Sequence, residues 1–205
     1  ASDLLGYSLV LLNGRRAGTG NMAMIMTRDV ERVEIIRGPG AVQYGSAAMG
    51  GVINVITRQG EGPLHAEVFS GLGSFGFAEG GGLLAGETEK FDYSLGYARS
   101  TMNDYNTASG DRYRNTGFDS KTGISLNGGY SFSEGNRLGL IFTGFNVDKD
   151  GNPGYINTVD TDDYTDKDNY SLDMRYNGRN TSGMYQWMAR YFFGKDENSW
   201  TNPVE

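Results

Sequence analysis

The most constraining feature of this sequence is an alternation with a period of two residues, which starts near Leu64 and continues to the end of the chain. Aromatic or aliphatic side chains take every second position in seven stretches: 64–74, 77–86, 91–98, 124–132, 136–148, 170–176 and 185–193. Because successive side chains of a β-strand point to opposite faces, each stretch predicts a strand with one apolar and one polar face.

The connections between these strands alternate in length. Short links at 87–90, 133–136 and 178–182 alternate with long polar stretches at 103–117 and 149–167. Strands of about ten residues with such connections are typical of an outer-membrane β-barrel. A soluble antiparallel β-sandwich also alternates and is the second interpretation. The barrel is favoured because the polar faces carry small, hydrated residues and because Tyr or Phe recur at strand ends.

The first sixty residues have a different pattern. Compact aliphatic runs at 9–12, 33–36 and 52–56 are bounded by Gly, Asn or Pro, which predicts buried strands of a small mixed α/β domain. A short helical turn is predicted within 27–32. The pattern changes near Gly60, so we expect one domain over 1–60 and a second over 61–205.

Composition and motifs exclude several classes of function. The chain has no cysteine, which excludes disulfides, zinc ribbons and thiol catalysis. His65 is the single histidine and no G-x-S-x-G motif is present, so we do not expect an enzyme. The net charge of −7 argues against binding to nucleic acid. The chain has no signal peptide, so we expect it to be mature or to lack its beginning.

Two local motifs suggest ligands. Residues 71–76 match G-x-G-x-x-G, but the glycines at 80–82 oppose the helix that a dinucleotide site requires, so this segment predicts a hairpin. Aspartates crowd the second long polar stretch, where calcium, a hard cation, could bridge them. The candidate ligands are Asp148, Asp150, Asp160, Asp162 and Asp163. A solvated acidic loop without metal is the favoured interpretation and calcium the second one, and no other cofactor is expected.

The most specific segment is 29–58, DVERVEIIRGPGAVQYGSAAMGGVINVITR. It closely resembles the end of the plug domain of TonB-dependent outer-membrane receptors, in which V-E-R, R-G-P, Y-G and G-G-V-I-N follow one another in this order. The motif residues are Arg32, Glu34, Arg37, Gly38, Pro39, Tyr44, Gly45, Gly50, Gly51 and Asn54.

The resemblance implies a fold and a function. Segment 1–60 would be the C-terminal half of the plug, and 61–205 would be about seven strands of a 22-stranded transmembrane β-barrel. The receptor would bind cobalamin or a ferric siderophore outside the bacterial outer membrane and import it when TonB, acting through a segment absent here, remodels the plug. The rest of the barrel, or a second chain, would complete the wall in the membrane lipid.

Within this family the layout of strands and loops is most similar to the cobalamin branch, in which calcium orders extracellular loops. The alternative functions are a passive porin or adhesin and a soluble β-sandwich binding module. The resemblance also implies that the short links face the periplasm and the long loops face outside. We further expect Arg32, Glu34 and Arg37 to pair with polar groups on the inner barrel wall and so to anchor the plug.

Overall fold

The computed structural model describes residues 8–16, 27–38, 44–45, 48, 50–110, 113–155, 158–159 and 162–203. These residues form a four-stranded sheet, a seven-stranded sheet and one small two-stranded hairpin. In this part of the chain, no helix has the length and apolar character needed to cross a membrane.

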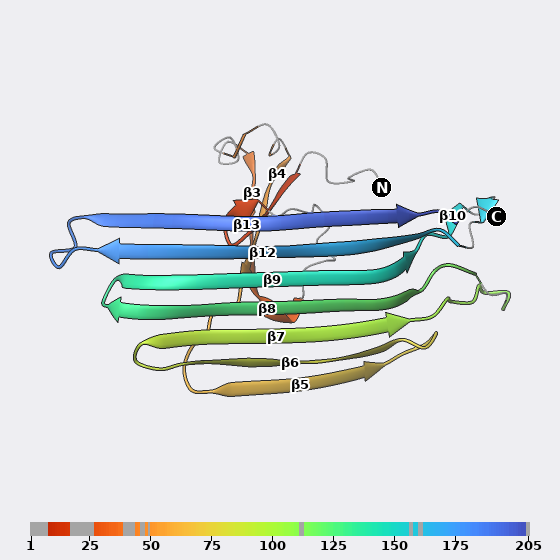
Figure 1. The fold of residues 1–205 in the computed structure, drawn as a ribbon, viewed down its shortest axis with the longest axis horizontal. Helices are drawn as coiled ribbons and strands as arrows, with labels where there is room; N and C mark the ends of the chain where they lie inside the picture. Colours follow the sequence, from red (N-terminus) through yellow and green to blue (C-terminus); the bar gives the residue numbers. More distant parts are fainter. Residues whose placement is uncertain are drawn as a thin grey trace.

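The seven-stranded sheet, which we call the long-strand sheet, is antiparallel throughout (Figure 1). Its spatial order is β13-β12-β9-β8-β7-β6-β5. The strands are β5 (His65–Leu72), β6 (Ala78–Glu87), β7 (Phe91–Met102), β8 (Phe118–Ser133), β9 (Asn136–Gly151), β12 (Tyr164–Arg179) and β13 (Gln186–Thr201). Each of the seven predicted strands is confirmed, and each pairs with its sequence neighbour in the sheet.

The four-stranded sheet, which we call the N-terminal sheet, has the order β2-β1-β4-β3. Its strands are β1 (Ser8–Leu12), β2 (Arg15–Arg16), β3 (Val30–Ile36) and β4 (Gly51–Thr57), and a 3-10 turn, η2, spans Thr27–Asp29. Leu9, Leu11, Ala48 and Val52 form its buried core. The three predicted strands are confirmed. The helical turn predicted within 27–32 is correct only for its first three residues, because Val30 already pairs with Thr57.

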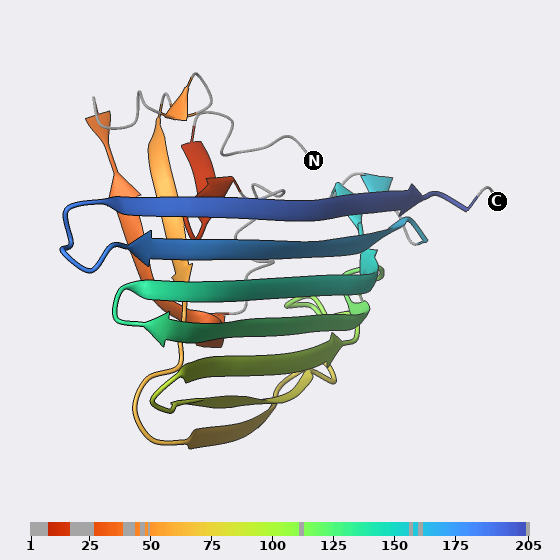
Figure 2. The same ribbon diagram turned by 60° about the vertical axis from the view of Figure 1, so that its left-hand side comes forward.

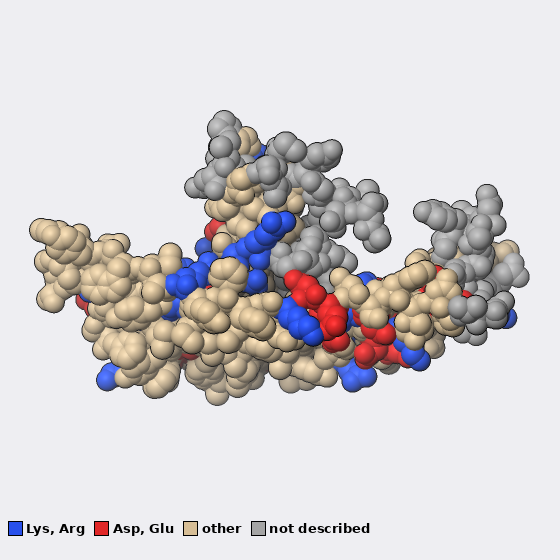
Figure 3. Space-filling model, turned by 45° about the horizontal axis from the view of Figure 1, so that its top comes forward, with Lys and Arg blue, Asp and Glu red and all other residues tan. Residues whose placement is uncertain are grey.

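The N-terminal sheet lies against one face of the long-strand sheet, and its strands cross the long strands steeply (Figures 1 and 2). We call the covered face the inner face and the opposite one the outer face. Charged side chains gather on the side from which the N-terminal sheet rises, whereas the parts of the opposite side in view are mostly uncharged (Figure 3). The covered face is therefore the polar one on β7, β8 and β12, whereas β9 also places Phe145 and Val147 on it.

The outer face carries the apolar positions of the alternation. Strand register aligns one such row across six strands: Leu84, Leu95, Leu126, Phe142, Leu172 and Phe193. Leu95 is 41% exposed and Phe193 is 50% exposed. A soluble sandwich would bury such a row against a second sheet, but among the described residues the second sheet lies on the polar side. The arrangement fits a lipid-facing surface.

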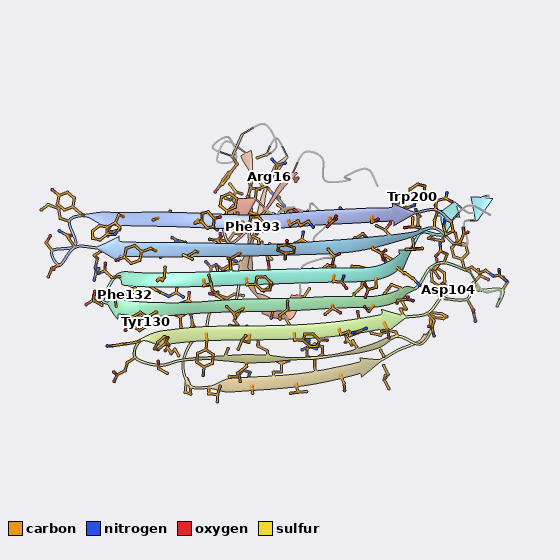
Figure 4. The ribbon with its side chains drawn as sticks, viewed as in Figure 1. Arg16, Asp104, Tyr130, Phe132, Phe193 and Trp200 are labelled. Atoms are coloured by element: carbon orange, nitrogen blue, oxygen red, sulfur yellow. The ribbon has the colours of Figure 1, made fainter. Side chains whose placement is uncertain are left out.

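Aromatic rings mark the short-turn end of the outer face. Tyr130 contacts Phe91 and Phe132, with ring centroids 4.7 and 4.8 Å apart, and Phe132 lies 6.3 Å from Tyr176 (Figure 4). A second contact joins Tyr170 and Phe193. Tyr170 precedes Tyr176 by six residues on β12, a rise of about 20 Å. The rings therefore lie at the two ends of the apolar stretch of β12, as the aromatic girdles of membrane barrels do.

Five strands, β7, β8, β9, β12 and β13, are longer than the sequence predicted. β9 continues to Gly151 and β12 begins at Tyr164, so the loop predicted over 149–167 is wrong at both ends. The remaining connection contains the hairpin of β10 (Gly154–Tyr155) and β11 (Thr158–Val159). Beyond the apolar band both faces of a strand are in water, so polar cross-strand pairs such as Asn146–Asp168 replace the alternation. The predicted loop 103–117 lies between β7 and β8 as expected.

Candidate functional site: the interface between the two sheets

The inner face has a row of small residues where the N-terminal sheet comes close. Strand register aligns these five across β7, β8, β9, β12 and β13: Gly96, Ser125, Thr143, Ser171 and Gly194. We call them the middle row. The short side chains of this row leave space on the inner face of the long-strand sheet, so the backbone and short side chains of another element can approach it. Two contacts, one toward each end of this row, join the sheets.

The first contact, which we call the Asp173 contact, is a charge network on β12 and β13. Asp173 is 5% exposed and accepts hydrogen bonds from Arg190, whose Nε lies 2.9 Å from Oδ1 and which also donates through Nη2. The same Nη2 donates to the backbone carbonyl of Asn13, 2.9 Å away, and so reaches the N-terminal sheet. Arg15 approaches the carboxylate of Asp173 to 4.0 Å.

Burial and the charge of Asp173 have opposite effects on the pKa of Arg15. Burial lowers the pKa of the Arg15 guanidinium, while the nearby carboxylate of Asp173 raises it. In the Asp173 contact two guanidinium groups lie at the carboxylate, and Arg190 also donates to the carbonyl of Asn13. The anion and both cations therefore have partners. Such a buried network is costly to break from one side.

The second contact, which we call the Asp29 contact, places a carboxylate from η2 on β7 and β8. Asp29 is 6% exposed, and its carboxylate lies beside the hydroxyl of Ser125, since Oδ1 and the Ser125 Oγ both lie within 2.7 Å of a Cβ placed on Gly96. It lies directly on Gly96, where an added Cβ would overlap Oδ1 and would come within 2.7 Å of Cγ. Among the described residues Oδ2 has no hydrogen-bond partner.

Burial dominates the electrostatics of the Asp29 contact. It raises the pKa of the Asp29 carboxyl above its ordinary value, and the Ser125 hydrogen bond and the Arg58 charge only partly oppose this effect. The Asp29 carboxyl is therefore buried, and its neighbours only partly offset the cost of burying its charge. Such groups are costly in the charged form.

Two further bonds flank the Asp29 contact. Arg28 forms an ion pair of 2.7 Å with Glu67 on β5, and its guanidinium lies 3.8 Å from the centre of the Phe69 ring. On the other side, Asn127 Nδ2 donates to the carbonyl of Arg58 at 3.0 Å. The η2 turn is thus held to β5, β7 and β8 at several points.

Two cavities lie between the sheets, on opposite sides of the middle row. The loop-side cavity has a volume of about 270 Å³, and its lining includes Thr27, Asp29, Ala98, Gly123 and Phe145. The turn-side cavity has a volume of about 400 Å³, and its lining includes Arg32, Asn127, Arg137, Ile141 and Arg175. On β8 the order is Gly123, Ser125, Asn127, so the residue that binds Asp29 separates the two cavities.

The predicted motif residues mostly organise the N-terminal sheet itself. Arg32 donates to Glu31 and Glu34, and Asn54 donates to Glu34 at 2.9 Å. These hydrogen bonds from Asn54 and Arg32 lower the pKa of the Glu34 carboxyl. Asn54 also accepts from the amide of Gly14, so it ties β3 to the β1–β2 turn. The described partners of Arg32 and Glu34 therefore lie within their own sheet.

Backbone conformation explains why three positions of the motif are glycine. Gly51 has φ +123°, and an added Cβ would lie 2.8 Å from the carbonyl oxygen of Ile36. Gly38 and Gly45 also have positive φ, which side chains disfavour. Tyr44 packs on the core of the sheet. Arg37 follows β3, Gly50 precedes β4, and Pro39 lies outside the described residues.

Sequence reasoning missed the residues that make the two contacts. Asn13, Arg15, Arg28 and Asp29 precede the recognised motif or stand at its first position, and nothing in their spacing marks them. Asp173 was visible only as a polar position of an alternating strand. A charged residue in the middle of the polar face of a predicted barrel strand is the one usable signal, because a lumen-facing charge needs a partner.

The predicted calcium ligands are distributed among protein partners. Asp150 pairs with Lys121 at 3.1 Å and with Lys167 at 2.7 Å, and Asp148 accepts from the Ser120 hydroxyl. Asp162 and Asp163 precede β12, and Asp160 lies outside the described residues. Across the described ranges, no three acidic, histidine or cysteine side chains gather in a way that could hold a metal ion. The calcium site stays a prediction.

Comparisons with known proteins agree on one group. The model of the family described as TonB-dependent Receptor Plug Domain matches residues 2–52. The chain is 45% identical over 85 residues to the vitamin B12 transporter BtuB of Photobacterium profundum, covering 39% of this chain and 14% of that protein. It is 32% identical over 157 residues to the rhizobactin receptor of Rhizobium meliloti, covering 71% of this chain and 18% of the receptor.

A solved structure extends the likeness over nearly the whole chain. A mutant of the ferric enterobactin receptor PfeA from Pseudomonas aeruginosa, in complex with enterobactin, superposes with a TM-score of 0.67 at 18% identity. The match covers 94% of this chain and 34% of that one. At this identity the likeness shows the fold, and it confirms the predicted fold class. The chain spans less than a fifth of the length of the two curated relatives.

Proposed function

Because this chain belongs to the TonB-dependent receptors of the bacterial outer membrane, we propose that it takes part in active nutrient import through a pore that its N-terminal sheet closes. It is a receptor component and not an enzyme. In this proposal the N-terminal sheet is the plug over 1–60, and the long-strand sheet over 61–205 is part of the barrel wall in lipid. TonB, the energy-coupling protein, would move the plug.

One observation carries the proposal: among the described residues, polar contacts hold the N-terminal sheet to the inner face, and the buried apolar cluster lies within the N-terminal sheet itself. Arg190 donates a hydrogen bond to Asn13 and Asn127 donates one to Arg58, and Asp29 lies on Gly96. Cavities remain on both sides of them. Polar contacts can exchange with water when they open, so such a closure is removable, as active import requires.

The nutrient we propose is cobalamin or a ferric siderophore, following the named relatives. A cavity of about 470 Å³ lies beside the two long connections, and its lining includes Asp104, Asp119, Asp162 and Lys149. Of the two classes we favour cobalamin, because the relative with 45% identity over 85 residues is a vitamin B12 transporter.

Growth separates these alternatives. We would express the receptor from its native gene in a strain that lacks its own cobalamin and siderophore receptors. We expect growth that depends on cobalamin and is lost when TonB is deleted. Growth on ferric siderophore alone would correct the nutrient and keep the mechanism.

Two outcomes would support the alternatives. Uptake that persists without TonB would indicate a passive porin. A chain that stays folded and monomeric without detergent would indicate a soluble binding module.

A further inference from the structure

The position of Asp29 has a consequence for the route through the receptor. Its contact with Gly96 and Ser125 lies between the loop-side cavity, which reaches Gly123 and Phe145, and the turn-side cavity, which reaches Asn127 and Ile141. On β8 and β9 only the middle-row residues, Ser125 and Thr143, thus lie between the two cavities. Displacement of the η2 turn would join them.

The two contacts differ in how firmly they hold. At β12–β13 the bonds between the sheets are those of buried groups, from Arg190 to the Asn13 carbonyl and from Arg15 to Asp173. At β7–β8 Asp29 Oδ2 has no partner among the described residues, and the neighbouring ion pair of Arg28 with Glu67 is exposed and contributes little. An unsatisfied buried acceptor lowers the stability of its contact, while a satisfied buried pair resists opening. The interface is therefore weaker at β7–β8 than at β12–β13.

We propose that Asp29 is the release point of the plug: the η2 turn leaves the wall at Gly96 and Ser125 first, while the Asp173 contact holds. This opening would connect the loop-side and turn-side cavities into one passage along β7–β9. The inference rests on the proposed import function, because it assigns the first movement of that mechanism.

The middle row provides a matched pair of reporters. Ser125 and Ser171 align with the same residue, Thr143, from its two sides, and both are buried, at 9% and 7% exposure. Ser125 lies under Asp29, whereas Ser171 neighbours Arg15, since both lie 3.7 Å from a Cβ placed on Gly194. Ser125→Cys and Ser171→Cys therefore report the two ends of the interface with one chemistry.

The experiment measures the labelling rate of each cysteine by a membrane-impermeant maleimide in living cells. In energised cells with TonB we expect Ser125→Cys to react on the order of tenfold faster than Ser171→Cys. Leu11→Cys, in the core of the N-terminal sheet, should stay unlabelled, because the turn is released without unfolding of the sheet. Deletion of TonB should slow labelling at Ser125→Cys.

A disulfide tests whether the release is needed. Gly96 would place a Cβ 2.7 Å from Asp29 Cγ, so the two Cβ atoms are at most about 4.2 Å apart, which does not exceed the roughly 4.5 Å upper limit for disulfides. Oxidised Asp29→Cys/Gly96→Cys should lose import of the nutrient that supports growth, and reduction should restore it. The control is Thr143→Cys/Ser171→Cys, whose parent hydroxyls lie 2.7 Å apart within the wall. It should import in both states.

The outcomes separate this inference from the proposed function. Equal or faster labelling at Ser171→Cys, or import that continues with the Asp29–Gly96 link oxidised, overturns the release point and leaves import intact. Import or labelling that does not depend on TonB overturns the proposed function itself. Import without labelling at either serine also overturns the release point.

Discussion

The two places where the N-terminal sheet meets the wall use the same residue type in opposite ways. At one, Asp173 is buried among Arg190 and Arg15, and its charge is matched. At the other, Asp29 is buried equally deeply, but it has one hydroxyl partner and a more distant arginine, Arg58. Burial alone therefore says little about how strongly an aspartate holds two elements together.

A polar interface with two unlike contacts can be stable and still open in a defined order. A contact with matched charges costs much to open, and a contact with an unsatisfied acceptor costs less. The Asp173 contact lies at one end of the middle row and the Asp29 contact at the other, so the two ends of the interface differ in strength. The weaker end is also the one that separates the two cavities, so the order of opening decides where a passage forms.

The largest effect is expected at the strong contact. Asp173→Asn removes the anion between Arg190 and Arg15, so these two largely buried cations lose the carboxylate that they share. We expect a loss of about 3 kcal/mol in the free energy of unfolding, measured by urea denaturation of the receptor in detergent. The matched control is Asp119→Asn, whose partner Lys149 is exposed, and it should change stability by less than about 1 kcal/mol. Equal effects would remove the distinction between the contacts.

The next effect concerns the glycine under Asp29. Gly96→Ala adds a Cβ that overlaps Asp29 Oδ1, so the turn must move away from the wall. We expect faster cleavage of the N-terminal sheet by protease and a destabilisation of about 1–3 kcal/mol. Gly128→Ala on β8 is the control, because its Cβ would meet only the carbonyl of Asp92 at 3.8 Å. Indistinguishable cleavage of the two variants would mean that η2 does not rest on Gly96.

Much of the fold could be predicted because the alternation is a local property of the strands. Each apolar position of 91–98 and 170–176 lies on the outer face as expected, since period two fixes the face once one strand is placed. The ends of the strands could not be predicted in the same way. Outside the apolar band, polar residues such as Asp168 remain in β12, where the alternation no longer distinguishes strand from loop.

The candidate site was less predictable, because it depends on how two sheets meet. The recognised motif pointed to Arg32 and Glu34, whose described partners lie in their own sheet. The contact residues Asp29 and Ser125 are 96 positions apart in the sequence, and only the register of β8 brings Ser125 to the middle row. One sequence by itself does not show how the two sheets pack against each other.

A smaller effect is expected from pH. Burial raises the pKa of Asp29, so its contact is most stable when the carboxyl is protonated, below its ordinary pKa of 3.8. Stability is lost as the pH rises through the raised value. Ser125→Cys should therefore be labelled a few-fold more slowly in acidic medium, where the Asp29 carboxyl is protonated, than at neutral pH.

The pH effect needs a background correction, because maleimide chemistry and other groups also respond to pH. Arg58 acts on Asp29, and Arg28, Glu79 and Lys121 line the same cavity. The rate is therefore compared with Ser125→Cys in an Asp29→Asn background, which should show no additional slowing. An identical pH profile in both backgrounds would mean that another of these groups titrates.

The smallest effect is expected at Arg32, the first of the motif residues predicted to anchor the plug. Its ion pairs with Glu31 and Glu34 are exposed and lie on the same strand, so Arg32→Gln removes no bond between the sheets among the described residues. We expect unchanged protease resistance of the N-terminal sheet, because exposed pairs contribute little. Arg28→Gln is the comparison, since it removes the ion pair with Glu67 on the wall, and it should increase cleavage. If Arg32→Gln loosened the sheet more than Arg28→Gln, the motif itself would be the anchor, and the asymmetry between the Asp29 and Asp173 contacts would no longer decide how the plug is held.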